Sequence, residues 1–116
     1  SYLLVNAMIR GRMCEVIAAS RTPSDSGSFF FAGLLSHLDA LLGVPTDQAV
    51  KSLPLTPEVE AALTEQSGPI GAALRAVQAW ERGDWQQGLV ADSTDEVRKA
   101  YLEALRWAEE SKHLLH

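Results

Sequence analysis

The chain has very little cysteine: its 116 residues contain one, Cys14. A single cysteine excludes an internal disulfide and any C-x-x-C motif, and it favours a reducing compartment such as the cytoplasm. The neighbours Met13, Val16 and Ile17 are apolar, so we expect a buried, unreactive thiol. A chain of this length can bury a core without disulfides or metal.

Two further absences limit the partners. No apolar run approaches the ~20 residues that a membrane helix needs, and no Lys or Arg precedes the apolar start SYLLVNAMIR, as it would in a signal peptide. The net charge is −5, and the ten basic residues are scattered. Nucleic acids and anionic membranes select clustered Lys and Arg. We therefore expect neither a nucleic acid nor a membrane as the partner.

The sequence also lacks any alternation of period two that is long enough for a strand. Its apolar residues recur at helical spacing between capping and helix-breaking residues. We predict an all-α fold, a compact bundle of about six to seven helices in a single domain over residues 1–116. The expected helical segments are 2–19, 29–42, 46–52, 56–66, 69–83, a short turn over 84–89, and 93–114.

Several helix ends have local signals. Ser28 or Ser26 is the expected N-cap of the 29–42 helix, and Gly43 follows its last residue. Thr56 before Pro57 is an N-cap with proline at the first helical position. The S-x-x-E pattern over residues 93–96 has the form of a capping box for the last helix.

The stretch FFFAGLLSHLDALLG, residues 29–43, is strongly apolar but carries Ser36, His37 and Asp39 in its middle. Such a run is either a buried helix with an internal hydrogen-bonding role or a site. Gly33 inside a helix costs about 1 kcal/mol relative to alanine. We expect it to mark a close helix–helix crossing.

The chemical motifs that could make this stretch a site are absent. His37 and Asp39 are two residues apart, so they diverge on a helix and cannot share a metal ion. Ser36 has no positioned base. His113 and His116 can share a helix face, but no acidic or thiol companion is near them. We expect no catalytic residue, no metal site and no bound cofactor.

Two places are candidates for an interaction surface. Residues 20–28, SRTPSDSGS, are turn formers and helix cappers and predict a surface loop. If the loop binds a partner, Asp25 belongs to that surface. Trp85 lies beside Gly83 and Asp84 and is either a packing residue or, if exposed, part of an interface.

Several motifs resemble one protein family. Residues 7–15, AMIRGRMCE, are similar to a helix of the HD-related output domain (HDOD) family, and residues 31–43 resemble its "GLLS-LD-LLG" signature. Residues 53–56, LPLT, are similar to its "LPLS" stretch, and E-x-G-D at 81–84 is similar to a later segment of that family. The resemblance covers nearly the whole chain and is strongest to the version joined behind an EAL domain, the cyclic-di-GMP phosphodiesterase fold. The chain resembles the C-terminal portion of such a domain, which agrees with its abrupt apolar start.

The resemblance implies an HD-domain-like fold without the metal ligands of HD phosphohydrolases. It implies a non-catalytic regulatory or protein-interaction module of bacterial signal transduction, linked to cyclic-di-GMP signalling through an attached or partner EAL domain. A residual HD-type phosphohydrolase and a nucleotide-binding module without chemistry are the alternatives. The latter needs a basic pocket, for which Arg10, Arg12 and Arg75 are the first candidates. Formation of a homodimer is compatible with this interpretation.

Within this reading, four polar residues in two apolar helices form a candidate structural cluster: Arg10, Glu15, Ser36 and Asp39. A buried carboxylate without a partner costs several kcal/mol, so Asp39 would need a donor such as Arg10. Arg12 and Glu15 are also spaced to pair on one helix.

Overall fold

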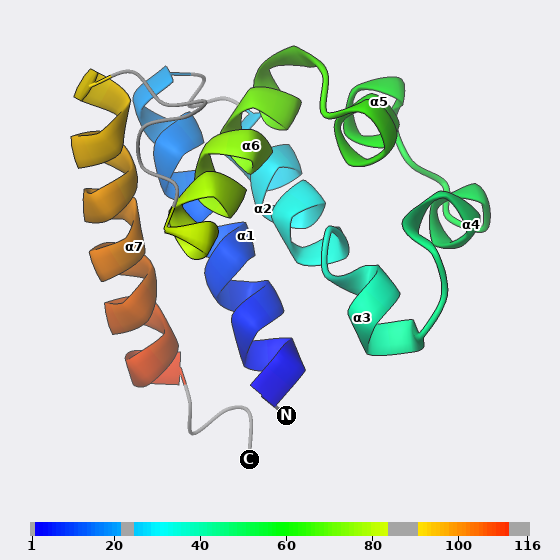
Figure 1. Ribbon diagram of the computed structural model, residues 1–116, viewed down its shortest axis with the longest axis horizontal. Helices are drawn as coiled ribbons and strands as arrows, with labels where there is room; N and C mark the ends of the chain where they lie inside the picture. The colour runs from blue at the N-terminus through cyan, green and yellow to red at the C-terminus, as the bar shows by residue number, and fades with distance from the viewer. Residues whose placement is uncertain (1, 22–24, 84–90, 112–116) are drawn as a thin grey trace.

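The computed structural model describes residues 2–21, 25–83 and 91–111. Every regular element in these ranges is a helix (Figure 1), which confirms the predicted all-α fold. None of the described helices is long and apolar enough to cross a membrane. Seven helices occur in these ranges: α1 (Tyr2–Arg21), α2 (Ser26–Leu35), α3 (Leu38–Leu42), α4 (Thr46–Lys51), α5 (Pro57–Glu65), α6 (Gly68–Arg82) and α7 (Ala91–Ser111).

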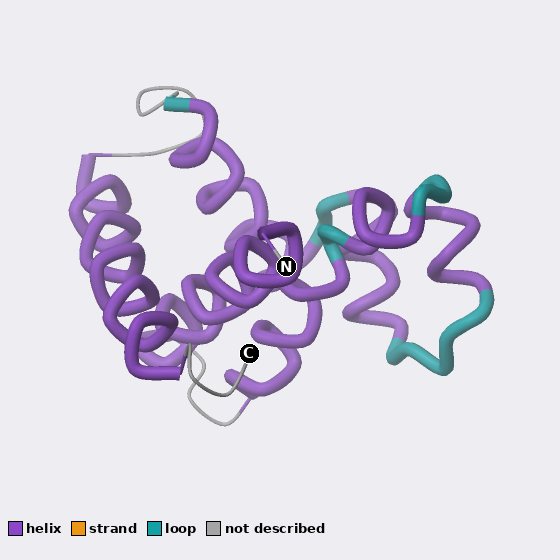
Figure 2. Tube along the Cα trace, turned by 90° about the horizontal axis from the view of Figure 1, so that it is seen from below, coloured by secondary structure: helices purple, strands orange, loops and turns teal. Residues whose placement is uncertain are grey.

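The first helix, α1, lies at the centre of the main body. It contacts α2, α6 and α7, and also α3. Its first half is apolar around most of its circumference, and these helices cover part of it, while Leu3 and Leu4 are exposed. The chain then continues through α3 and α4 into α5, which returns to α2 and α6. Seen from below, α3, α4 and α5 form a lobe to one side of α1 and α7 (Figure 2).

The core forms where α1, α2, α5, α6 and α7 meet. Its largest fully buried side chains are Met13, Cys14, Ile17, Leu74, Val77 and Val97. Alanines fill many of the remaining buried positions, among them Ala18, Ala32, Ala62, Ala73, Ala100 and Ala104. Small side chains let helix axes approach closely. None of the described polar or charged residues is fully buried, so the polar contacts of the fold lie at the edges of this core.

The backbones of α1 and α2 touch where the two helices cross, at Gly11 and Gly33. A Cβ atom on Gly33 would lie 2.6 Å from the Gly11 Cα atom and 3.0 Å from the Arg10 carbonyl oxygen. A Cβ atom on Gly11 would lie 2.8 Å from the Phe30 carbonyl oxygen. Close-packed interiors leave no room for such an atom unless the backbones move apart. The predicted crossing at Gly33 is confirmed, and Gly11 is its partner.

The predicted continuous helix over 29–42 is wrong, because the chain breaks at Ser36 and His37. Helix α2 ends just before Ser36, and α3 begins just after His37. The Ser36 hydroxyl donates to the Gly33 carbonyl oxygen at 2.6 Å. The His37 N–H bonds to the Leu34 carbonyl oxygen, three residues back, at 3.3 Å. Serine side chains compete with helical hydrogen bonds in this way, so the last turn of α2 tightens and ends.

Helix ends that depend on a single local residue follow the prediction. Gly43 ends α3 with a φ of 72°, in the left-handed region that glycine adopts readily. The Val59 N–H donates to the Thr56 hydroxyl at 3.3 Å, with Pro57 at the start of α5. At these two places the local sequence is therefore sufficient to predict where the helix begins or ends.

Two other predictions about helix ends differ from the structure, and a third concerns residues outside the described ranges. The N-cap of α2 is Asp25, not Ser26 or Ser28; all three are good capping types, so the sequence does not choose between them. Helix α7 begins at Ala91, so the predicted capping box over 93–96 lies inside its first turns. Acidic residues also stabilise a first turn through the helix dipole, which produces the same pattern. The predicted turn over 84–89 lies outside the described residues.

We predict that Gly33→Ala lowers the free energy of unfolding by about 2 kcal/mol, because its new methyl group must push α1 and α2 apart. Urea denaturation followed by circular dichroism measures this change. Gly27→Ala is the matched control, since Gly27 lies in the same helix and a Cβ atom there would meet nothing within 4 Å. The control should be neutral or stabilise by up to about 1 kcal/mol. Equal effects of the two substitutions would contradict a tight crossing.

Candidate functional site

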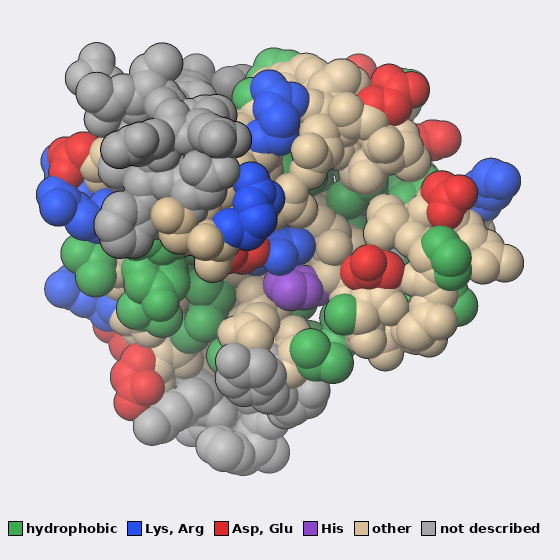
Figure 3. Space-filling model, viewed as in Figure 1, with side chains coloured by type: hydrophobic (Ala, Val, Ile, Leu, Met, Phe, Trp, Pro, Cys, Tyr) green, Lys and Arg blue, Asp and Glu red, His purple; other side chains and the backbone are tan. Residues whose placement is uncertain are grey.

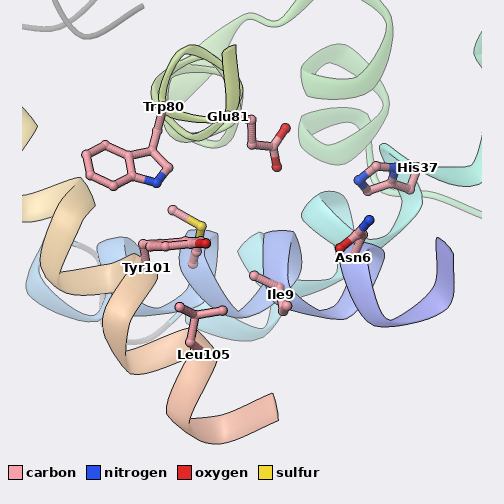
Figure 4. A pocket seen from close by; sticks show the side chains of 8 residues that line it. Asn6, Ile9, His37, Trp80, Glu81, Tyr101 and Leu105 are labelled. Carbon is pink, nitrogen blue, oxygen red and sulfur yellow. The ribbon is translucent and has the colours of Figure 1, made fainter. Parts of the chain in front are cut away.

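A pocket of about 540 Å³ lies between α1, α6 and α7, beside the break between α2 and α3. Its lining residues are Asn6, Ile9, Met13, His37, Trp80, Glu81, Tyr101 and Leu105 (Figure 4). The volume falls within the range that is usual for small-molecule sites. Each of the three helices contributes two or more of these residues, so the shape of the pocket depends on how the helices pack.

The pocket has a polar end and an apolar end. Figure 4 shows Asn6 and His37 at one end, and the Glu81 carboxyl group points into the space beside them. Trp80, Tyr101 and Leu105 gather at the other end. The rings of Trp80 and Tyr101 pack against each other with centroids 5.6 Å apart. On the face seen in Figure 3, a histidine lies next to basic and acidic side chains.

Arg10 joins three helices at the polar end of the pocket. Its Nε and Nη2 atoms donate to the two carboxylate oxygens of Glu81, at 3.0 and 2.6 Å. Its Nη1 atom donates to the Ser36 hydroxyl at 2.9 Å. The Arg10 side chain is only 12% exposed and that of Glu81 34%. The guanidinium fork therefore ties α1 to the end of α6 and to the end of α2.

The structure brings two of the four predicted cluster residues together, Arg10 and Ser36. Glu15 instead pairs with Arg12, one turn away on α1, at 2.6 Å, which is the pairing that their spacing predicts. Asp39 lies on the exposed side of α3, where its carboxylate accepts from the Ala40 N–H at 2.8 Å. Asp39 is therefore not bonded to Arg10: the break after α2 turns α3 away, and an exposed carboxylate needs no buried donor.

Glu81 is the partner of Arg10 that sequence reasoning missed. It lies 71 positions further along the chain, so no helical spacing connects the two residues. One signal was available: a basic residue in a strongly apolar helix needs an acceptor from another element. That signal does not say which of the 15 acidic residues provides it. Trp80 and Tyr101 were also not recognised as neighbours, for the same reason.

His37 is half-buried at the rim of the pocket. Its burial, and then the nearby positive charge of Arg10, lower the pKa of His37 below the usual 6.5, while Glu81 and Asp39 act weakly in the other direction. Both main causes disfavour the charged imidazole. His37 is consequently neutral at neutral pH, when a ring nitrogen can accept a hydrogen bond.

The remaining reactive and aromatic side chains have packing roles. Cys14 is buried, and its burial raises the thiol pKa to about 12, which agrees with the expected inert cysteine. Trp107 packs edge-on against Phe30, with ring centroids 6.0 Å apart. The Arg12 guanidinium lies 5.8 Å from the centre of the Trp107 ring, where a cation–π contact forms.

The other predicted positions add no chemistry within the described residues. There, no group of three or more His, Cys, Asp or Glu side chains is placed to hold a metal ion. Asp25 is exposed at the start of α2. Trp85, with the interaction surface expected there, lies outside the described residues, as do His113 and His116.

Comparison with known proteins relates the chain to part of two longer ones. It is 32% identical over 113 residues to the cyclic di-GMP phosphodiesterase CdgJ of Vibrio cholerae serotype O1, which is 91% of this chain and 26% of that protein. It is 30% identical over 105 residues to the uncharacterized protein YuxH of Bacillus subtilis, 87% of this chain and 25% of that protein. The chain thus spans about a quarter of the length of these curated relatives.

The other two comparisons give no match. No protein-family model matches the chain, and no solved structure matches it. The similarity to CdgJ extends over most of the chain.

We predict that Arg10 and Glu81 are energetically coupled. A double-mutant cycle with Arg10→Met and Glu81→Gln should give a coupling free energy of about 1 kcal/mol, below that of a fully buried pair because Glu81 is partly solvated. The matched control is the Asp95–Lys99 pair of α7, whose side chains are 51% and 76% exposed. Its coupling should be about 0.3 kcal/mol. Similar values for both pairs would contradict the bridging role of Arg10.

We also predict a pH dependence of stability from His37. Because its pKa is lower in the folded state than the unfolded value of 6.5, the unfolded chain takes up the proton first as the pH falls. Stability should be fully present above pH 6.5 and decrease as the pH falls through the lowered pKa of the folded state. Urea titrations between about pH 7.5 and 5.5 measure it. The free energy of unfolding of His37→Gln should decrease less over this range. If the substitution leaves the pH dependence of stability unchanged, His37 is not the cause of that dependence.

Proposed function

We propose that residues 1–116 are a single helical domain, the C-terminal portion of an HDOD domain, and that it acts as a non-catalytic regulatory or protein-interaction module. Its pathway is cyclic-di-GMP signalling in the bacterial cytoplasm, through an attached or partner EAL domain. The observation that carries this proposal is the homology to a cyclic di-GMP phosphodiesterase over 91% of the chain.

The signature residues give a physical reason to favour a non-catalytic role. Gly33 and Ser36 belong to the G-L-L-S motif that resembles the family. Gly33 allows the contact between α1 and α2, and Ser36 ends α2 while accepting a hydrogen bond from Arg10. Both residues therefore stabilise contacts between helices. This structural role accounts for the motif, and no catalytic role is needed to explain it.

The two alternatives receive less support. A metal-dependent phosphohydrolase needs several ligands that converge on one point, and the described residues offer no such group. A site for an anionic nucleotide needs free basic side chains. Arg10 is bonded to Glu81 and Ser36, Arg12 to Glu15, and Arg75 to the Gln66 carbonyl oxygen.

We predict that the purified chain hydrolyses no cyclic di-GMP, with or without added Mg²⁺ or Mn²⁺. In the longer protein that carries this chain, Gly33→Ala should change phosphodiesterase turnover at least about threefold, because the domain's packing is altered while any catalytic domain is intact. Gly27→Ala is the control and should leave turnover unchanged. Hydrolysis assays of all variants, with metal analysis of the purified chain, measure these outcomes.

Turnover by the isolated chain together with a bound transition metal would support the phosphohydrolase and exclude the non-catalytic proposal. Wild-type turnover in the longer Gly33→Ala protein, with its domain shown to be destabilised by circular dichroism, would exclude regulation of an attached enzyme.

A further inference from the structure

The pocket between α1, α6 and α7 is not explained by the proposed role as an interaction module. Its walls are mostly apolar and aromatic, and it also holds three half-buried polar side chains, Asn6, His37 and Tyr101. None of these three side chains has a hydrogen-bond partner within the part of the chain that the structure describes. Polar side chains that line an apolar pocket and have no protein partner are typical of ligand sites.

The charges around the pocket balance. Glu81 of α6 lines the pocket, and its charge is neutralised by Arg10 of α1 through two hydrogen bonds. Asp39 of α3 is the next acidic group to act on His37, but it is exposed to solvent. An ionic ligand would place an uncompensated charge beside apolar walls, which is unfavourable. An uncharged ligand avoids that penalty.

The apolar end suits a flat ring. Trp80 and Tyr101 meet at an interplanar angle of 50°, and Leu105 lies beside them (Figure 4). Aromatic side chains pack favourably against further rings in offset or edge-on arrangements. At the other end of the pocket, Asn6 can both donate and accept a hydrogen bond, and a neutral imidazole at His37 can do the same.

We propose that this pocket binds an uncharged, planar molecule with an amide-like group at one end. Its ring packs against Trp80, Tyr101 and Leu105, and its polar group bonds to Asn6 and His37. A phosphate-bearing nucleotide does not fit this site, because the Glu81 carboxylate points into the same space. The inference is independent of the proposed interaction with an EAL domain, since it concerns the pocket of the 116-residue chain alone.

Two probes of equal shape test the proposal: cinnamamide, which is uncharged, and cinnamate, its carboxylate counterpart. Each is titrated into the isotope-labelled chain at about pH 8, where His37 is neutral, and backbone chemical shifts are followed by NMR. Cinnamamide should bind with a dissociation constant on the order of 1 mM and shift the residues around the pocket. Cinnamate should bind at least about tenfold more weakly. Equal binding, or no saturable shift at the pocket, would overturn the proposal.

Two substitutions on the same helix locate the site. Leu105→Trp fills the apolar end and should weaken cinnamamide binding at least about tenfold. Leu102→Trp is the matched control, because Leu102 is 58% exposed and does not line the pocket; its affinity should be unchanged. If circular dichroism shows that Leu105→Trp is unfolded, Asn6→Leu replaces it and should weaken binding at least about threefold. Unchanged affinity in the folded pocket variant would overturn the proposal.

A pH titration tests whether the protonation state of His37 determines which ligand charge the pocket accepts. Protonation of His37 adds a positive charge beside the matched Arg10–Glu81 pair, so cinnamate should bind at least about threefold more tightly as the pH falls from about 8 to about 5.5. His37→Gln should remove this gain. A cinnamate affinity that does not change while the ring shifts of His37 record its protonation would overturn the role of His37 in selecting the charge of the ligand.

Discussion

The contact between the backbones of Gly11 and Gly33 is the constraint on which the rest of this structure depends. Because neither residue has a side chain, α1 and α2 approach until a Cβ atom on one would touch the other. That approach brings Arg10, next to Gly11, within hydrogen-bonding distance of Ser36, one turn beyond Gly33. Ser36 ends α2 and directly precedes His37 at the rim of the pocket, so this bond connects the crossing to the pocket.

Arg10 extends the consequence of the crossing to α6. A guanidinium group has donors in a planar fork, so it can bond both oxygens of Glu81 and still reach Ser36. The same interaction determines the net charge around the pocket. The negative carboxylate of Glu81, which faces the cavity, is neutralised by the positive guanidinium of Arg10 beside it. Packing and charge balance therefore have a common origin in this part of the fold.

Most of what could be predicted from the sequence was local. The all-α class, the caps at Thr56 and Gly43 and the close crossing at Gly33 each follow from a few neighbouring residues. The break at Ser36 and His37 could not be predicted, since an apolar stripe continues through it and a serine hydroxyl can bond to a carbonyl oxygen one turn back without ending a helix. The pocket itself was missed, because its walls come from residues that lie up to 99 positions apart, Asn6 and Leu105.

The two contacts that organise this region join residues at very different separations along the chain, which has a consequence for folding. Gly11 and Gly33 are 22 positions apart, whereas Arg10 and Glu81 are 71 apart. Closing a longer loop has a larger entropic cost, and contacts between near neighbours tend to form sooner. We therefore expect the hairpin of α1 and α2 to be present in the folding transition state and the α6 contact to form afterwards. The pocket would then be the last part of the chain to acquire its shape, and the first to lose it when the protein opens.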